Sequence, residues 1–226
     1  MMLQSPTKTA HSKQLVERLT TVLHGSVVIV ALSLACCLFD GSLFAWHPAL
    51  MSVGYIIFMS EGVLSAVMFR TLDGPERVSA IWSHALLQAR AMVCIVAGFV
   101  VIYRNKVVNG RSHFLSTHAQ VGLATMLLSL GSPLLGLVSF RRMGIIQRFP
   151  ERLQPRIKWL HRQLGVVTWL MSLVTIQLAL RHPAVYKGGL TIFWQVGVGL
   201  IAAVMGVLLA KAGAKAKEED GIGKAV

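Results

Sequence analysis

Acidic residues, cysteines and charged residues in general are scarce in this sequence. Only 9 of its 226 residues are Asp or Glu, and 14% are charged, against about a quarter in ordinary soluble domains. Intrinsic disorder is excluded for most of the chain because 54% of the residues are hydrophobic. The cysteines, Cys36, Cys37 and Cys94, lie in apolar runs and two are adjacent, so we expect free thiols and no disulfide scaffold. These shortages predict an integral membrane protein.

Basic residues, by contrast, are common, and 22 Lys and Arg give a formal net charge of +13. In a soluble protein such an excess indicates nucleic-acid binding. Here the basic residues lie between the apolar runs, which is typical of residues at the two faces of a membrane. We therefore expect the lipid bilayer, and not nucleic acid, to be the partner of this charge.

Several apolar runs are long enough to cross the hydrocarbon core, which takes about 20 residues of helix. The runs are continuous, whereas the strands of a membrane barrel alternate apolar and polar residues. The sequence therefore predicts an all-α membrane protein with six transmembrane helices. The runs are Leu19–Phe39, Ala49–Phe69, Val78–Tyr103, Thr117–Phe140, Leu160–Leu180 and Leu190–Ala210.

The polar ends of the chain flank this membrane domain. We expect a cytosolic N-terminal segment at residues 1–17, a six-helix domain at 18–210 and a cytosolic C-terminal tail at 211–226. With six spans, both termini lie on the same side as the second and fourth links. Most Lys and Arg residues lie on that side, and the positive-inside rule places it in the cytosol.

Four histidines lie near the starts of predicted helices: His47, His84, His118 and His161. Consecutive helices start on opposite sides, so His47 and His118 share one depth, and His84 and His161 share the other. Much of a core roughly 30 Å thick separates the two depths, which allows two bis-histidine sites but no single metal site. Two imidazoles suit the axial positions of haem iron, whereas zinc takes four ligands. No CxxCH motif occurs, so the sequence predicts haem that is not covalently attached.

Two glycines support a flat cofactor beside the helices. Gly122 and Gly165 follow His118 and His161 by four residues and therefore share their helix faces. A glycine there leaves room for a macrocycle, although small residues also let membrane helices pack closely. Both explanations stay open at the level of sequence.

The other histidines have weaker signals. His113 lies five residues before His118, nearer the outer water, and is a candidate for contact with a substrate. His24 has no obvious partner and is interpreted as a packing residue. We expect His11 and His182 to face solvent.

Arg90 and Glu61 are the charged residues predicted to lie within spans. Charges inside a membrane are costly and are usually neutralised by a partner. We expect these two residues to form a buried ion pair. A haem propionate is the alternative partner of Arg90, through charge-assisted hydrogen bonds.

Four stretches resemble the eukaryotic cytochrome b561 family of transmembrane ascorbate-dependent oxidoreductases. The likeness is greatest to the small members of this family that are called cytochrome b561 domain-containing proteins. The four stretches are Ser42–Glu61 (SLFAWHPALMSVGYIIFMSE), Trp82–Gln88 (WSHALLQ), His113–Leu123 (HFLSTHAQVGL) and Trp159–Gly165 (WLHRQLG). The resemblance covers about residues 15–210.

The resemblance implies that the second to fifth helices form a four-helix core holding two haem b groups. It implies the same pairing of ligands, His47 with His118 and His84 with His161. It also implies electron flow from a cytosolic donor, usually ascorbate, to monodehydroascorbate or a ferric chelate across the membrane. Many members form dimers, which makes a homodimer a further expectation.

A cytosolic ascorbate anion would need positive charge near His84 and His161. The candidates are Arg77, Arg156 and Lys158, and their alternative partners are lipid headgroups. The best-known members of the family carry lysines close to the start of the third helix. Here Arg77 is the nearest preceding cation, so this sequence departs from the family pattern at the donor site.

The predicted function is transmembrane electron transfer by a dihaem b-type cytochrome that acts as a monodehydroascorbate or ferric reductase. Three alternatives stay open: a haem-containing subunit that passes electrons between quinol and a partner, a histidine-dependent proton or metal transporter, and a haem-free scaffold. A transporter is expected to show inverted repeats and broken helices, and neither is clear in the sequence.

Overall fold

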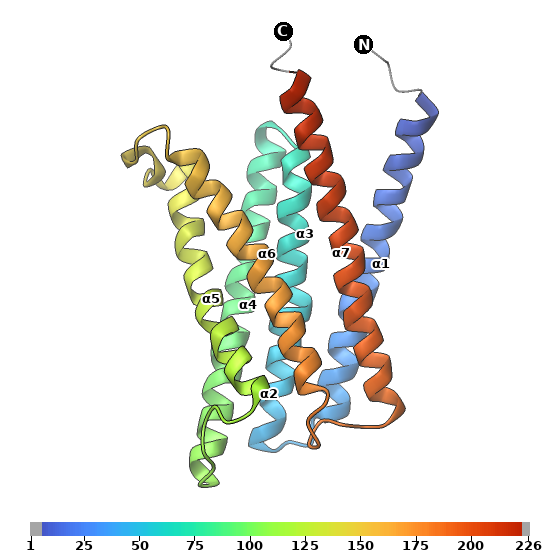
Figure 1. Ribbon diagram of the computed structural model, residues 1–226, viewed down its shortest axis with the longest axis vertical. Helices are drawn as coiled ribbons and strands as arrows, with labels where there is room; N and C mark the ends of the chain where they lie inside the picture. Colours follow the sequence, from blue (N-terminus) through green and yellow to red (C-terminus); the bar gives the residue numbers. More distant parts are fainter. Residues whose placement is uncertain (1–5, 223–226) are drawn as a thin grey trace.

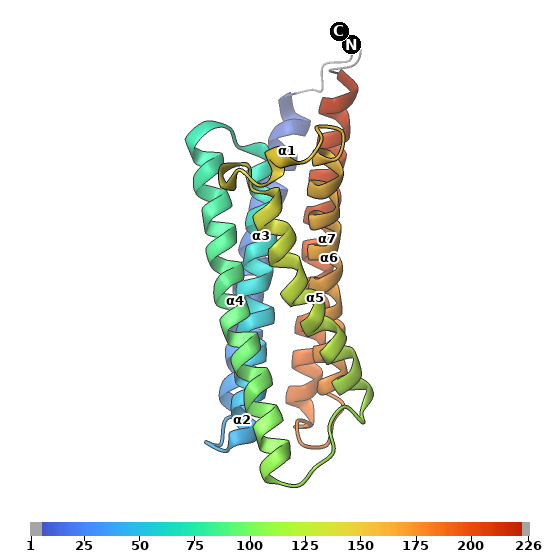
Figure 2. The same ribbon diagram turned by 90° about the vertical axis from the view of Figure 1, so that its left-hand side faces the viewer.

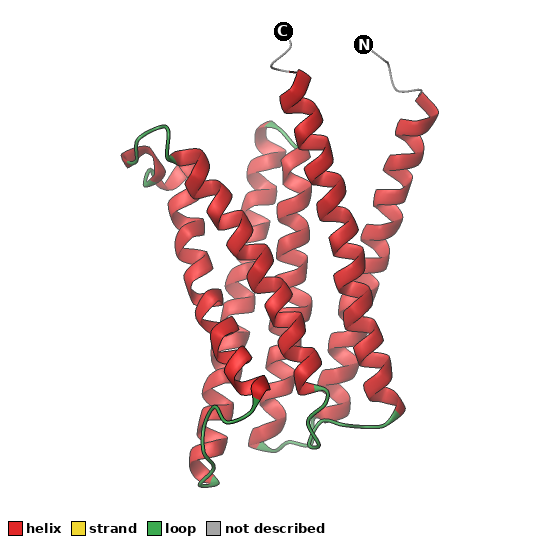
Figure 3. Ribbon diagram, in the orientation of Figure 1, coloured by secondary structure: helices red, strands yellow, loops and turns green. Residues whose placement is uncertain are grey.

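The computed structural model describes residues 6–222, and within this part of the chain it contains helices and no strands (Figures 1 and 3). Six long helical passes follow one another, the second of them built from three consecutive segments. The passes are α1 (Pro6–Leu38), α2 (Leu43–Met51) with η1 (Ser52–Met59) and α3 (Ser60–Met68), α4 (Gly74–Val108), α5 (Thr117–Ser139), α6 (Gln154–Ala179) and α7 (Gly189–Ile222). Short 3₁₀ turns lie in two links, η2 (Phe69–Thr71) in one, and η3 (Arg141–Met143) and η4 (Ile146–Arg148) in the other. The predicted all-α class is confirmed.

The passes run up and down along one long axis, so the described start of α1 and end of α7 lie at the same end (Figures 1 and 2). Each link between passes contains a glycine with positive φ, a conformation that other residues adopt at a steric cost. These glycines are Gly41, Gly74, Gly110, Gly144 and Gly188. Gly74 is the first residue of α4, and the other four glycines lie inside the links, where they let the chain reverse its direction.

Five helices are long and apolar enough to cross a membrane: Ala10–Leu38, Leu43–Met68, Gly74–Val108, Thr117–Ser139 and Gly189–Lys215. The protein is thus an integral, multi-pass membrane protein. The fifth predicted run lies in α6, which has 26 residues but falls outside this group of five. Polar residues such as Arg162, Gln163 and Gln177 lower its hydropathy.

The helices extend beyond the predicted apolar runs. α1 begins at Pro6 instead of near Leu19, and α7 continues to Ile222 instead of ending near Ala210. Hydropathy marks the part of a helix that suits lipid, whereas Lys, Glu and Ala continue a helix into water because their helix propensity is high. The expected boundaries at 17/18 and 210/211 therefore do not coincide with helix ends.

Two buried tryptophans join the passes at the core. The indole N–H of Trp169 in α6 donates to the Ser60 hydroxyl at 2.9 Å, and that of Trp194 in α7 donates to the Ser33 hydroxyl at 3.1 Å. Both indoles have no exposed surface. Lipid offers no hydrogen-bond partner, so these bonds fix α6 against α3 and α7 against α1.

Gly197 lies where α7 closely approaches α1, and a substitution at this position tests the packing. A Cβ at this position would collide with Cγ2 of Val30, which is buried, whereas a Cβ at Gly206 of the same helix would meet nothing within 4 Å. We expect Gly197→Ala to be less stable than Gly206→Ala by about 1–3 kcal/mol, because overpacking forces the helices apart. The difference in unfolding free energy is measured in detergent, with circular dichroism as the signal of unfolding. Equal stability of the two variants would contradict the packing of α1 on α7.

Candidate functional site

His47 and His118 face each other at the end of the bundle that carries the links 39–42 and 109–116. Their ring centroids are 6.3 Å apart and the planes meet at 73°. His47 projects from α2, where Ser42 caps the helix by accepting a hydrogen bond from the Ala45 N–H. His118 lies near the start of α5, which Ser116 caps in the same way.

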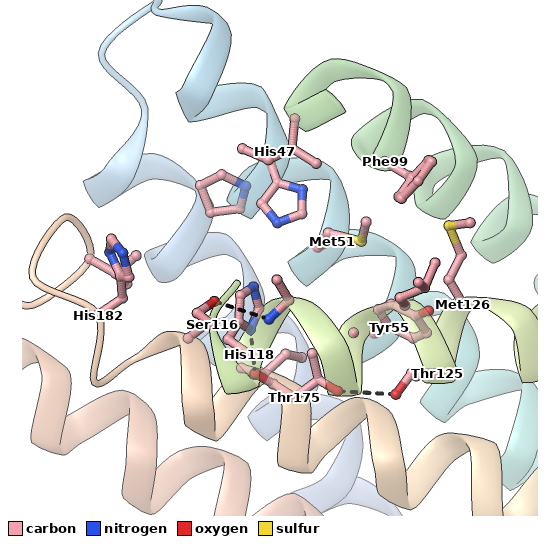
Figure 4. A pocket seen from close by; sticks show the side chains of 18 of the residues that line it. His47, Met51, Tyr55, Phe99, Ser116, His118, Thr125, Met126, Thr175 and His182 are labelled. Carbon is pink, nitrogen blue, oxygen red and sulfur yellow. Dashed lines mark hydrogen bonds between the residues drawn. The ribbon is translucent and has the colours of Figure 1, made fainter. Parts of the chain in front are cut away.

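Backbone carbonyls orient both of these rings. Nδ1 of His47 donates to the Gly98 carbonyl of α4 at 3.0 Å. Nδ1 of His118 donates to the Thr175 carbonyl of α6, also at 3.0 Å (Figure 4). Since a carbonyl only accepts, the proton must reside on Nδ1. Each Nε2 therefore keeps a free lone pair that can bind a metal.

A cavity of about 210 Å³ adjoins this pair. Its lining is mostly apolar, with Met51, Tyr55 and Phe99 beside the two histidines (Figure 4). Gly122 also lines it, and a Cβ there would meet the Thr175 methyl group at 3.4 Å. The cavity is thus a mostly apolar slot lined by two imidazoles.

His84 and His161 form a second pair at the opposite end. Their ring centroids are also 6.3 Å apart, with an interplanar angle of 78°. Nδ1 of His84 donates to the Gly62 carbonyl of α3 at 2.7 Å. Nδ1 of His161 is buried and lacks a hydrogen bond of normal geometry, although the backbone of Ser132 is close enough to interact with the ring.

Glycines also border the second pair. A Cβ on Gly136 would come within 3.1 Å of Cε1 of His161, so only glycine leaves this ring undisturbed. A Cβ on Gly165 would lie 4.0 Å from the Ser132 hydroxyl, an ordinary contact. Gly165 therefore leaves room beside α6, while Gly136, which the sequence analysis did not single out, approaches the ring more closely.

The spacing of each pair fits one metal ion between two imidazoles. A ring nitrogen lies about 1.2 Å from the ring centre and binds a metal at about 2.0–2.1 Å, so two such rings have centres about 6.4 Å apart. The observed separation in both pairs is 6.3 Å. Among the described residues, no third His, Cys, Asp or Glu completes a metal-binding group with either pair. A macrocycle that fills the other ligand positions, as in haem, fits this donor set.

His113 lies at the mouth of the first cavity. Its ring stacks on Tyr103, with centroids 4.3 Å apart and planes at 22°. Lys106 also lines the mouth, and its ammonium donates to the Ser112 carbonyl at 2.8 Å. His182 is exposed, as expected, and also lines this cavity.

The three cations predicted for the other end, Arg77, Arg156 and Lys158, lie at the starts of α4 and α6. The structure also brings Arg70 and Arg162 together there: burial, and then the charge of Arg162, lower the pKa of Arg70. Arg70 is also a more distant candidate from the sequence, but its proximity to Arg162 depends on the tertiary packing and could not be predicted.

The predicted ion pair between Glu61 and Arg90 is wrong. Glu61 accepts a hydrogen bond from Nδ1 of His24 in α1 at 2.8 Å, so the histidine interpreted as a packing residue is its partner. The Glu61 side chain is 18% exposed and that of His24 is 52% exposed. Arg90 lies on the exposed surface of α4, and the described residues offer it no ion-pair partner. α4 turns Arg90 to a face different from the one that packs on α3.

The chain is similar to known transmembrane reductases. The model of the eukaryotic cytochrome b561 family matches residues 46–187, which include all four paired histidines. The chain is 30% identical over 143 residues to "Probable transmembrane reductase CYB561D1" of Mus musculus, covering 62% of this chain and 59% of that protein. It is 29% identical over 157 residues to "Transmembrane reductase CYB561D2" of the same species, covering 66% and 67%. It is 27% identical over 168 residues to "Transmembrane ascorbate-dependent reductase CYB561" of Sus scrofa, covering 74% and 64%. The chain thus spans about three fifths to two thirds of these relatives.

The bond between His24 and Glu61 can be tested by a double-mutant cycle. We expect His24→Ala and Glu61→Ala to couple by about 1 kcal/mol in unfolding free energy, because each removes the same hydrogen bond to a potentially charged group. The control cycle combines His24→Ala with Glu76→Ala at the exposed start of α4, and its effects should add. Additive effects in both cycles would show that the bond does not join α1 to α3.

Proposed function

The chain belongs to the eukaryotic cytochrome b561 family, and from this premise we propose that it is a transmembrane oxidoreductase that carries electrons from cytosolic ascorbate across the membrane. The family implies b-type haem. The observation that carries the proposal is the presence of two histidine pairs, each with the spacing of a bis-imidazole metal site, at opposite ends of one bundle.

Two haem b groups are the proposed cofactors. His47 and His118 would be the axial ligands of one, and His84 and His161 those of the other. When bound, haem supplies the one-electron redox chemistry. Backbone carbonyls orient the rings of His47, His84 and His118, and such an Nδ1–H bond makes the opposite nitrogen a better ligand. Gly122 and Gly165 keep the helix faces beside His118 and His161 free of side chains.

α6 is proposed as the sixth span. It packs along α5, and its polar residues Thr168, Ser172 and Thr175 are buried and not exposed to lipid. Part of its modest hydropathy therefore reflects polar residues that face the protein interior, and the rest reflects residues such as Arg162 and Gln163, which are exposed. With six spans, and with most basic residues at the end that carries the α5–α6 link, the positive-inside rule places both termini in the cytosol.

The proposed ascorbate site lies at the cytosolic end, near His84 and His161. Arg77, Arg156 and Lys158 remain the candidates for binding the ascorbate anion. The Arg70–Arg162 pair adds positive charge beside His161, since Arg162 is the next residue in the chain. Clustered cations lower the cost of bringing an anion to the protein surface.

The proposed acceptor site is the mouth of the cavity beside His47 and His118. Lys106 supplies a positive charge and His113 a ring that can donate a hydrogen bond, which suits an anion such as monodehydroascorbate or a ferric chelate. The stack of His113 on Tyr103 holds that ring in place.

An absorption spectrum tests the donor. We expect ascorbate to produce a b-type α band in the purified protein, with dithionite adding little. A band that forms only with dithionite would favour the quinol-linked subunit. Protein expressed with added haem that gives no band would overturn the proposal and favour a transporter or a scaffold.

Single substitutions test the pairing. We expect His84→Ala to remove one of two haem signals, in redox titration and in bound haem per chain, and to leave the other. Gly136→Ala should shift the potential of the same haem because its methyl group displaces His161. Gly131→Ala is the matched control, since a Cβ there meets nothing within 4 Å. Retention of both haems by His84→Ala would contradict the assigned ligands.

A further inference from the structure

α6 and α7 enclose an apolar groove that lies apart from both histidine pairs. The two helices are neighbours joined by the link 180–188 (Figure 1). The cavity between them has a volume of about 330 Å³. Its walls are formed mainly by Leu170, Val174 and Leu178 of α6 and by Val198, Gly199 and Ala202 of α7.

Small residues on α7 keep the groove open. A Cβ added to Gly199 would meet nothing within 4 Å, and Ala202 follows nearly one turn later on the same face. On the other wall, Leu170 and Val174 are 44% and 53% exposed. The groove is therefore open to the surroundings of the helices, which in a membrane protein are lipid.

One side of the groove has the length of one leaflet. The lining residues of α6 run from Leu170 to Leu178 and Arg181 follows them, which at 1.5 Å per residue is about 16 Å, whereas those of α7 span only Val198–Ala202. Half of a hydrocarbon core about 30 Å thick is nearly the same length. Since Arg181 lies just beyond the end of α6, its end of the groove is at the membrane boundary.

Arg181 puts an unpaired positive charge at that end. Its side chain is exposed and has no hydrogen bond or ion pair within the described part of the chain. The sequence has no Asp or Glu between Glu151 and Glu218, so the α6–α7 hairpin cannot neutralise it. Asp40 is the carboxylate of the nearby links, and hydrogen bonds from Ser42 lower the pKa of Asp40, with Lys187 as its charged neighbour. Arg181 is thus available to an anion from outside the described part of the chain.

We propose that this groove binds a phospholipid, with one acyl chain between α6 and α7 and the phosphate on Arg181. The guanidinium donates paired hydrogen bonds to phosphate oxygens, which is the geometry that suits arginine. Gln177 lines the groove between its apolar part and Arg181. Its side-chain amide donates a hydrogen bond to the Gln195 carbonyl at 2.8 Å. A phospholipid brings both an apolar chain for the groove and a phosphate for Arg181, so it is the better occupant.

Native mass spectrometry of the full chain tests the site. The protein is purified from membranes in mild detergent and titrated with palmitoyl-oleoyl phosphatidylglycerol. We expect wild type to retain one tightly bound lipid and Gly199→Leu to lose it, because the leucine fills the groove. Gly206→Leu is the matched control, since this glycine of α7 also has open space but lies outside the groove.

The headgroup contact is tested by Arg181→Gln. Loss of a hydrogen bond to a charged group should weaken retention of the lipid by about tenfold or more. Arg111→Gln in the α4–α5 link is the control and should bind as wild type. Ala202→Leu provides a second groove-filling variant, and circular dichroism shows which variants are folded.

Two outcomes overturn the proposal. Equal lipid retention by wild type and by folded Gly199→Leu and Ala202→Leu would show that the groove is not the site. A lipid-free dimer of wild type that becomes a monomer in Gly199→Leu would show that a second copy occupies it. Neither result depends on haem or on ascorbate.

Discussion

The bundle depends on the mutual anchoring of the histidine rings through the backbone. His47 in α2 bonds to the Gly98 carbonyl of α4, and His84 in α4 bonds back to the Gly62 carbonyl of α3. Helical carbonyls already accept one bond within the helix, so each ring uses the second lone pair. Both anchors are glycines because the helices approach closely there: a Cβ on Gly98 would lie 3.2 Å from Cβ of Leu50, and one on Gly62 would collide with Gln88.

The number of residues between a histidine and the carbonyl anchor on the same helix recurs around the bundle. This number sets the distance between the two levels, the depths at which the two histidine pairs lie. Gly98 follows His84 by fourteen residues, and Thr175, which holds His118, follows His161 by fourteen. Fourteen residues of helix rise about 21 Å, which keeps both levels within a core about 30 Å thick. Gly62 follows His47 by fifteen residues, and the π-helical segment η1 lies between them. A π turn takes up one extra residue, so the extra residue does not displace the anchor.

Between the two levels several polar groups of the core are paired, whereas the buried Thr168 hydroxyl has no hydrogen-bond partner among the described residues. The Tyr55 and Ser129 hydroxyls lie 3.2 Å apart, and those of Thr125 and Thr175 lie 3.1 Å apart. An unpaired polar group in a dry interior is costly, and these bonds allow polar side chains in helices that otherwise face lipid. Among the charges without an ion-pair partner in the described residues, Arg181 lies just beyond the end of α6, whereas Arg90 lies on the outer surface of α4.

The sequence by itself determined the class of fold and the positions of the paired histidines. In lipid, an apolar run of about 20 residues satisfies its own backbone hydrogen bonds by forming a helix. Because successive helices run in opposite directions, the position of each histidine along its helix gives its depth in the membrane. Only the tertiary structure decided the side-chain contacts, because these depend on the rotation of each helix about its axis. That rotation directs Glu61 to His24 and leaves Arg90 on the outer surface, and it brings Arg70 to Arg162. It also selects Gly62, Gly98 and Thr175 as anchors, because any residue has a carbonyl and only packing decides which one meets a ring.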